Sequence, residues 1–559
     1  MQRQYRAIKR ELPPGAILMF RLGDFYEMFG EDAVIASPIL GTTLTQRGGA
    51  PLCGIPYHAL DAYLAKLIRA GKTAAICDQM EDPRLVKKGQ VVRREVTRIV
   101  TPGTITEDGL LDAGTNTYIA AVSGCGLSLL DLSTGEFSVE PFETKERLDD
   151  ALARLRPAEI VLPRPEDDAP PPAGVSYADA WTFSFDAAQE ELLRHFNVTA
   201  LDGFGLEGKG DLVCAAGALL HYVHTTLRHA VGHIRSVRLR ESADFLALDA
   251  GTIRHLALLP GDGVSREASL LGVLNATRTP MGARRLAAWI RQPLRQVADI
   301  NARLDCVEAF VKDRIRLSSL QSRLAGVRDL ERLAAKVDSG RANARDLKAL
   351  AESLRPVPEI IADVAEVPAV GGIAARLSAE DAVVDLIDRA IAESPNVLLT
   401  EGNLIAPGYS AELDELRALA AEGNRWIAEY QAKEVERTGI KTLRVRRNSV
   451  FGFYIEISKA AAAGAPPEYE RRQTLTNAER FTTPELKEYE RKVLGAQERS
   501  HALEQDLFRE IVAQVAARTA SIQQTAAAVG ELDAILSCDD RAPAAGYVRP
   551  AVDDSDALE

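Results

Sequence analysis

The stretch RLGDFYEMF, residues 21 to 29, places an aromatic ring and a carboxylate two positions apart, at Phe25 and Glu27. An exposed ring can stack between bases, and a carboxylate beside it can accept a hydrogen bond from a base edge. The pattern also fits a plain structural role. Asp24 would be the N-cap of a helix, with Glu27 at capping-box spacing and Phe25 as the first helical residue.

On such a helix Tyr26 and Phe29 share one face at i and i+3, so we expect both in the core. Phe25 lies off that face. The residues alone therefore leave two interpretations open: a core aromatic with a capping partner, or a ring and an acceptor that probe a base stack.

A second group of side chains suits contacts to phosphate. Residues 437 to 447 carry five basic residues and no acid: Arg437, Lys441, Arg444, Arg446 and Arg447. A little further on, RRQTLTNAERF adds Arg471, Arg472, Arg480, Thr474, Thr476 and Asn477. Guanidinium, hydroxyl and amide groups donate hydrogen bonds to phosphate oxygens. The alternative is an ordinary solvated basic face.

Another basic run lies near the N-terminus, with Glu95 as its single acid: Arg84, Lys87, Lys88, Arg93, Arg94 and Arg98. Two basic surfaces at opposite ends of the chain could grip one duplex from two sides. Each would add salt-dependent affinity that is blind to sequence.

Composition limits the class of protein. At 559 residues we expect three to five domains, and an aromatic content of only 6% favours helices. The net charge of −13 argues against a uniformly basic nucleic-acid binder, so charge has to be read by segment. The six scattered cysteines contain no C-x-x-C pair, and no signal peptide or run of about 18 apolar residues is present. We expect buried thiols and a cytoplasmic protein.

Three other motifs are weaker. GKT at 71 to 73 lacks the first glycine of a P-loop and ends a helix. Gly203, Gly205 and Gly208 match a dinucleotide fingerprint without a preceding strand. His221, His224, His229 and His233 have helical spacing but no carboxylate or cysteine in the pattern, so we expect a helix surface instead of a metal site. No catalytic signature is found.

The hydrophobic periods indicate the elements that position these residues. A small α/β domain is expected from about 15 to 105 and a second from about 115, with a Pro-rich surface loop LPRPEDDAPPPAG. From about 245 the pattern is helical, and between about 440 and 482 a period of two indicates a β module. Thr483 and Pro484 restart a helix whose apolar ladder reaches about Leu536, roughly 75 Å if unbroken.

Taken together, several of these stretches identify a family. RLGDFYEMFGEDA, GIPYHALDAYLAKLIRAG, RIVTPGT, LLDLSTGEF, TPMGARRLAAWIRQPL, RRQTLTNAERF and TPELKEYERKVL occur in the order expected of the MutS family of bacterial DNA mismatch-repair proteins. The resemblance covers essentially the whole chain.

The resemblance implies a multidomain fold that is α/β and then mainly α-helical. It implies a mismatch-binding domain (1–105), a ribonuclease-H-like α/β connector (115–240), a helical core with lever helices (245–425 and 484–541), a β-rich clamp inserted between the levers (426–483), and the start of a linker (542–559).

Particular roles also follow from the resemblance. Phe25 would stack on a mispaired base from the minor groove and Glu27 would hydrogen-bond to that base. Arg47, Arg472, Thr474 and Asn477 are the candidates for contacts to the DNA backbone. Thr476 stands where the family pattern has Lys.

Members of this family continue into a dimerising ATPase domain, whereas this sequence has no P-loop. We therefore expect a fragment of a longer protein, with a naturally shortened relative as the alternative. ATP and Mg²⁺, the homodimer and the ATPase activity would belong to the intact protein. The expected partners are mismatched or looped duplex DNA and a MutL-like protein. Alternatively, the chain is an interaction scaffold that acts through the connector without binding DNA by itself.

Overall fold

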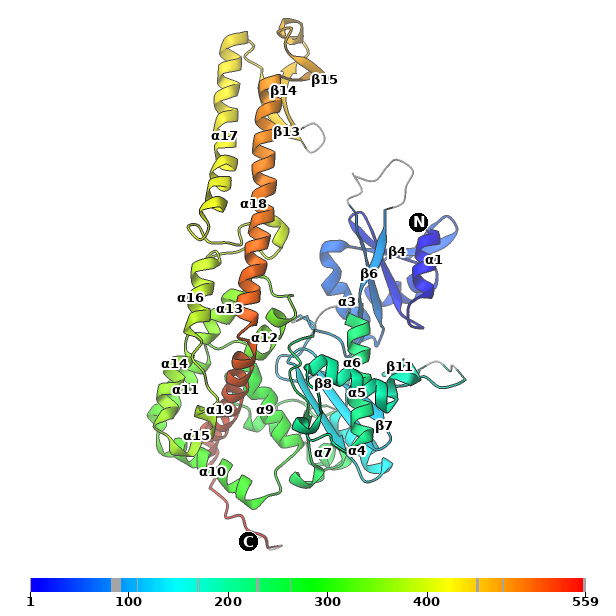
Figure 1. Cartoon of the computed structure of the whole chain (residues 1–559), viewed down its shortest axis with the longest axis vertical. Coiled ribbons are helices and arrows are strands. Elements are labelled where there is room, and N and C mark those ends of the chain that lie inside the picture. The colour runs from blue at the N-terminus through cyan, green and yellow to red at the C-terminus, as the bar shows by residue number, and fades with distance from the viewer. Residues whose placement is uncertain are drawn as a thin grey trace. The chain divides into compact units, whose positions relative to one another are not determined.

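The structure is a computed structural model that describes residues 2–81, 92–107, 109–167, 169, 171–227, 231–261, 263–448, 452–474 and 477–555. The chain divides into two compact units (Figure 1). The first unit comprises Met1–Arg341, Glu352–Asp381 and Ala516–Glu559, and the second comprises Ala342–Ala351 and Ala382–Val515. Helices and three sheets make up the described residues, so the chain is mixed α/β with a large helical share, as expected.

The N-terminal part of the first unit is built on a six-stranded sheet of order β3-β4-β2-β1-β5-β6. Its strands are β1 (Ile17–Leu22), β2 (Phe25–Phe29), β3 (Thr45–Arg47), β4 (Ala50–Pro56), β5 (Ala74–Gln79) and β6 (Arg94–Val100). Its helices are α1 (Gln2–Arg10), α2 (Glu31–Leu40) and α3 (Leu60–Arg69). Both faces of the sheet are covered, because Ile17 and Met19 pack in one buried cluster while Leu18 and Phe20 pack in another.

The expected helix at Phe25 is wrong, because residues 25–29 form strand β2. β1 and β2 pair antiparallel with Leu22 opposite Phe25, so Gly23 and Asp24 form a two-residue hairpin turn. Gly23 has φ +57 whereas Asp24 does not have a positive φ. A turn with glycine in the left-handed region at its first central position matches the right-handed twist of the strands, which is why Gly-Asp joins strands here and does not cap a helix.

A second six-stranded sheet has the order β11-β10-β7-β8-β9-β12. Its strands are β7 (Tyr118–Ser123), β8 (Gly126–Asp131), β9 (Glu136–Pro141), β10 (Glu159–Pro163), β11 (Val175–Ala178) and β12 (Arg238–Leu239). Its helices are α4 (Lys145–Leu155), α5 (Phe185–Phe196) and α6 (Gly210–Leu227). The Pro-rich segment joins β10 to β11, so its described residues form the loop within this domain that the sequence predicts.

Helices form most of the remainder of the first unit. They are α7 (Ala250–His255), α8 (Leu270–Leu274), α9 (Pro280–Arg291), α10 (Val297–Lys312), α11 (Arg314–Leu324), α12 (Leu330–Asp338), α14 (Val357–Ala365), α15 (Gly371–Ala374) and α19 (Thr519–Ala545). Asp533 on α19 accepts hydrogen bonds from the backbone N–H of Arg278 (2.9 Å) and of Thr279 (2.7 Å), just before α9 begins. This buried carboxylate therefore fixes the start of α9 against α19.

In the second unit, a four-stranded antiparallel sheet of order β13-β14-β16-β15 lies at one end of two long helices (Figure 1). The strands are β13 (Arg444–Asn448), β14 (Gly452–Ser458), β15 (Glu470–Thr474) and β16 (Ala478–Thr482); the long helices are α17 (Ala411–Thr438) and α18 (Pro484–Ala516), and α16 (Asp381–Ala390) and α13 (Ala344–Leu354) lie at the edge of the unit. Trp426 of α17 stacks on Tyr489 of α18 with ring centroids 3.6 Å apart, so the two helices lie side by side.

The helix boundaries around this sheet agree with the sequence. α17 ends at Gly439, which has φ +69, and Thr483 caps α18 by accepting a hydrogen bond from the N–H of Leu486 at 3.1 Å. The single helix of about 50 residues is wrong, however, because α18 ends at Ala516 and α19 begins at Thr519. At the break, the Arg518 guanidinium donates to both oxygens of buried Glu380, at 3.0 and 3.3 Å.

Candidate nucleic-acid interface

Strand β2 presents Phe25 and Glu27 on one face of the first sheet. Side chains alternate along a strand, so Tyr26 and Met28 point into the buried cluster on the other face. Phe29 shares the face of Phe25 and Glu27, but its ring packs edge-on against Tyr5 of α1, with centroids 5.0 Å apart. Phe29 is therefore buried, whereas Phe25 is 49% exposed. Tyr26 and Phe29 are both buried as predicted, but the prediction that they share one face is wrong, because they pack in clusters on opposite faces of the sheet. Of the two interpretations left open for Phe25, its exposure excludes the core aromatic.

The Glu27 carboxylate is bound by Arg47 in the DNA-free chain. Arg47 Nη1 lies 3.3 Å from Oε2 and 3.5 Å from Oε1 of Glu27. β4 lies between their strands, and the residue opposite Glu27 on β4 is Gly54. A Cβ on Gly54 would lie 3.6 Å from Cγ of Glu27, so the glycine leaves the Glu27 side chain room over β4. The three sequence candidates in this unit, Phe25, Glu27 and Arg47, therefore occupy one sheet.

A tight hairpin positions Arg47. β3 and β4 pair antiparallel with Arg47 opposite Ala50, so Gly48 and Gly49 form the turn. Both glycines have positive φ, +59 and +79, as the commonest two-residue hairpin turn requires. The Gly-Gly dipeptide in QRGGAP is the local sequence signal for this hairpin.

Hydrogen bonds on the face of the sheet opposite Phe25 and Glu27 hold β2 in place. The Tyr26 hydroxyl donates to Asp78 Oδ1 at 2.6 Å, and the Thr97 hydroxyl donates to Asp78 Oδ2 at 2.7 Å. Burial and the hydrogen bond to Asp78 raise the pKa of Tyr26, so the hydroxyl keeps its proton as a donor. These bonds tie β2 to β5 and β6. The local sequence predicts Tyr26 in the core but carries no signal for its partners, which lie more than 50 residues away.

Aromatic and cationic side chains also line the β1–β2 turn. The Arg21 guanidinium lies 3.8 Å from the centroid of the Tyr57 ring, and the N–H of Tyr57 donates to the carbonyl of Asp24 at 2.9 Å. Tyr57 is 42% exposed. The turn that leads into Phe25 is thus held by a neighbouring segment, GIPYHA, and no local sequence pattern predicts this contact.

The basic run near the N-terminus is not the open basic surface that the sequence predicts, as far as it is described. Arg84, Lys87 and Lys88 lie outside the described residues. Arg93 is paired with Glu95 and Arg98 with Glu107. Arg94 is buried and its guanidinium donates to the carbonyls of Arg21 (2.7 Å) and Val92 (2.9 Å).

The second unit carries the other three candidates. Arg472, Thr474 and Asn477 are all exposed at one end of the four-stranded sheet. The register of β15 against β16 shifts between Arg471 and Gln473, which places Arg472 at a β-bulge. A bulge redirects the extra side chain away from the regular alternation of the strand. Arg472 forms no ion pair with a residue that the structure describes. Thr476 lies outside the described residues.

Part of the basic charge of this sheet is neutralised. Arg437 binds Glu434 and Glu468, each at 2.6 Å, and Arg471 binds Glu479 at 2.9 Å. Arg446 and Arg480 share Glu456. Lys441 and Arg444 are exposed, and the side chain of Arg447 lies outside the described part. The acid-free run of the sequence therefore overstates the local charge, because acids from neighbouring segments approach it in space.

The weaker motifs form no site among the described residues. GKT follows the end of α3 and leads into β5, and no strand precedes Gly203. His221 and His224 lie near buried Glu191, His233 is buried, and His229 is outside the described residues. The described residues hold no group of three metal-ligating side chains, and none of the helices they form is long and apolar enough to cross a membrane.

Comparisons with known proteins match successive parts of the chain to domains of one family. Family models match for MutS domain I at residues 1–109, MutS domain II at 117–235 and MutS domain III at 251–538. The DNA mismatch repair protein MutS of Methanothrix thermoacetophila is 44% identical over 574 residues, and that of Salinibacter ruber is 41% identical over 578. In each case 99% of this chain is aligned, and it spans 65% and 63% of those relatives. The chain belongs to the MutS family.

Proposed function

We propose that this chain recognises mismatched or looped base pairs in duplex DNA. The observation that carries the proposal is the pairing of an exposed aromatic ring, Phe25, with an adjacent carboxylate, Glu27, on a strand that is fixed on both sides within a sheet. The relatives' name, DNA mismatch repair protein MutS, supports the same activity.

In this proposal Phe25 acts as a wedge. Inserting a ring between base steps costs a few kcal/mol, and the cost is smaller where pairing is defective or the duplex kinks easily. A ring on a rigid strand loses little conformational entropy on insertion. Discrimination then arises largely from the deformability of the DNA.

Glu27 adds selectivity through a specific hydrogen bond. A carboxylate is repelled by phosphates, so it favours binding only where a base edge donates to it. Matched duplex would suffer the repulsion without gaining the bond. Arg47, Arg472, Thr474 and Asn477 would contact the backbone, and such contacts add affinity without reading sequence.

The remaining roles belong to the intact protein and rest on the family resemblance. We propose ATP and Mg²⁺ as its cofactors, a homodimer as its assembly and a MutL-like protein as its partner. We also propose a ribonuclease-H-like connector, which the strand order β9-β8-β7-β10-β11 supports, since its first three strands are antiparallel and the next two are parallel.

The test is the affinity of this chain for duplexes that differ in one base pair. Fluorescence anisotropy with a G·T, an unpaired-T and a fully matched duplex, at one fixed salt concentration, gives the mismatch-to-match ratio. We expect a ratio well above one, and an equal affinity for all three duplexes would contradict the proposal.

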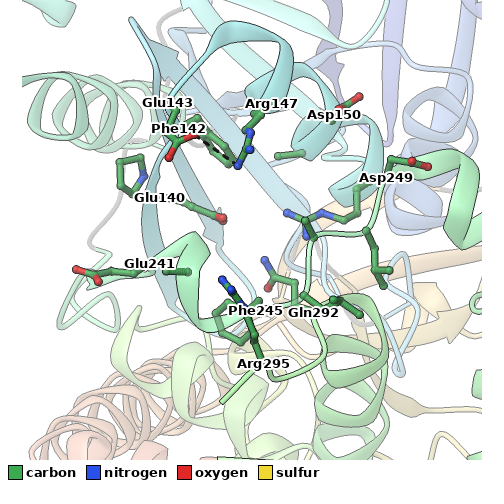
Figure 2. A pocket seen from close by; sticks show the side chains of 17 residues that line it. Glu140, Phe142, Glu143, Arg147, Asp150, Glu241, Phe245, Asp249, Gln292 and Arg295 are labelled. Atoms are coloured by element: carbon green, nitrogen blue, oxygen red, sulfur yellow. Dashed lines mark ion pairs between the residues drawn. The ribbon is translucent and has the colours of Figure 1, made fainter. Parts of the chain in front are cut away.

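A cavity on the connector favours a second function, the docking of a protein partner. The cavity has a volume of about 890 Å³ and lies between the end of β9, α4, residues 241–249 and the C-terminal end of α9. Figure 2 shows the ion pair between Glu143 and Arg147 among its lining side chains. Leu246, which also lines it, is 50% exposed.

A Leu246→Asp variant separates this function from DNA recognition. It should weaken capture of a purified MutL-like protein without changing the mismatch-to-match ratio. Leu256→Asp is the control, because Leu256 is 63% exposed and does not line the cavity. Equal capture by both variants would argue against docking at this cavity.

A further inference from the structure

A smaller cavity in the first unit is lined mainly by polar side chains. Its volume is about 370 Å³, and it lies where the β8–β9 turn and residues 233–240 face α9, α12 and α19. One wall is fixed by close backbone packing. A Cβ on Gly135 would lie 2.7 Å from the carbonyl oxygen of His233, and Gln523 of α19 donates to that same oxygen at 3.0 Å.

Arginine dominates the charge of this cavity. Among the described lining residues are four guanidinium groups, of Arg235, Arg238, Arg240 and Arg285, and two carboxylates, of Glu136 and Glu331. Most of these charges already have partners. Arg235 binds Asp338, Arg240 binds Glu136 and Glu331 binds Arg284, each at 2.6 Å.

Two of the four lining arginines, Arg238 and Arg285, take no part in these ion pairs. Within the described part of the chain, neither side chain donates a hydrogen bond nor forms an ion pair. Both lie near Glu136: burial would raise the pKa of this carboxyl, but the charges of Arg240, Arg285 and Arg238, with a hydrogen bond from Tyr118, hold it below the ordinary value. One carboxylate therefore faces three guanidinium groups, which leaves an excess of two positive charges around Glu136.

The two arginines come from different layers. Arg238 begins β12, which pairs with β9 in the second sheet, and Arg285 lies on α9. On the α19 side, Gln524 adds an amide that forms no hydrogen bond with the described residues. An anion bound between them would join the sheet to the helical part of the unit.

We propose that this cavity binds a small phosphate-bearing anion through Arg238 and Arg285. Guanidinium groups bind phosphate oxygens in a planar, bidentate geometry that chloride cannot match. The volume suits a ligand between pyrophosphate and a mononucleotide. The site is separate from Phe25 and Glu27 and does not depend on the function proposed above.

Isothermal titration calorimetry of the whole chain with pyrophosphate, at constant ionic strength, tests the site. We expect saturable binding to one site and a loss of affinity of about tenfold or more in the Arg238→Gln/Arg285→Gln double variant. Glu136 keeps its ion pair with Arg240 in this variant, so its carboxylate is not left without a partner. An Arg238→Lys/Arg285→Lys variant keeps the charge and should bind with intermediate affinity.

The matched control is Arg6→Gln/Arg254→Gln, which removes two exposed arginines that do not line the cavity. It should bind pyrophosphate like the unmodified chain. A second titration with ADP distinguishes the source of the phosphate, since tighter binding than pyrophosphate indicates a nucleotide. The proposal is overturned if pyrophosphate shows no saturable binding, or if Arg238→Gln/Arg285→Gln and Arg6→Gln/Arg254→Gln bind it equally. It is also overturned if succinate, an anion without phosphate, binds as tightly as pyrophosphate.

Discussion

The Glu27 carboxylate and the Arg47 guanidinium form an ion pair of 3.3 Å across β4, beside the exposed ring of Phe25. The Arg47 side chain is 57% exposed, so the pair is screened by solvent and contributes no more than about 1 kcal/mol. A phosphate can therefore take Arg47 from Glu27 at little cost. If a DNA backbone binds Arg47 as proposed, the Glu27 carboxylate loses this counter-charge.

Glu27→Gln should reduce the discrimination between mismatched and matched duplex by strengthening the binding of matched duplex. The substitution removes the charge that matched duplex repels but keeps an oxygen that can accept a hydrogen bond. We expect affinity for matched duplex to rise by about fivefold, which corresponds to about 1 kcal/mol, and the mismatch-to-match ratio to fall. Anisotropy titrations measure both affinities. Glu31→Gln, an exposed acid at the start of α2, is the control, and an equal change in both variants would contradict the prediction.

Phe25→Ala should abolish mismatch preference and leave sequence-blind binding largely intact. The ring is 49% exposed, so the free energy of unfolding should fall by less than about 2 kcal/mol. Phe185→Ala is the matched control, because Phe185 is 45% exposed and lies on α5, outside the first sheet. A Phe25→Ala chain that still prefers a G·T duplex to the native degree would refute the wedge.

Arg472→Ala should weaken binding to all duplexes alike. If Arg472 contacts one phosphate, the slope of log affinity against log salt should become shallower by about 0.9, with the mismatch-to-match ratio unchanged. Arg471→Ala is the control, since Arg471 is paired with Glu479 and has less charge to offer a backbone. A slope that is the same for Arg472→Ala and the unmodified chain would exclude this contact.

Local sequence signals predicted the elements whose ends carry strong caps or turns. The start of α18 after Thr483 and the four-stranded sheet both follow from such signals. The hairpin at Gly23 was misassigned because Asp24 and Glu27 also satisfy the spacing of a helix cap. The buried sheet around β2 decides between the two, and that depends on partners as distant as Gly54.

Ion pairs between residues that are distant in the sequence were the second feature that could not be predicted from the sequence. The sequence places five basic residues together near the four-stranded sheet, but Arg437 is also paired with Glu468 and Arg446 with Glu456, and both acids come from other segments. The same holds for the Glu27–Arg47 pair, whose members are 20 residues apart. The break between α18 and α19 carries no Gly or Pro, and its stabilising contact, Arg518 with Glu380, spans 138 residues.

Asp539→Asn should stabilise the chain at high pH. Asp539 lies fully buried on α19, neither of its carboxylate oxygens has a hydrogen-bond partner among the described residues, and burial raises its pKa from 3.8 to about 8 against a smaller opposing effect of Arg314. Between these values the unfolded chain has lost this proton while the folded chain keeps it. The group therefore lowers stability progressively as pH rises from about 4 to about 8.

Asn carries no charge in either state, so the variant should lose this part of the pH dependence. We expect the melting temperature of Asp539→Asn to exceed that of the unmodified chain at pH 8, by the equivalent of at least about 1 kcal/mol, and the difference to shrink towards pH 5. Asp540→Asn is the control, because Asp540 is the next residue on α19 and only partly buried. If the melting temperatures of Asp539→Asn and the unmodified chain change with pH in the same way across this range, the pKa of Asp539 does not differ between the folded and unfolded states.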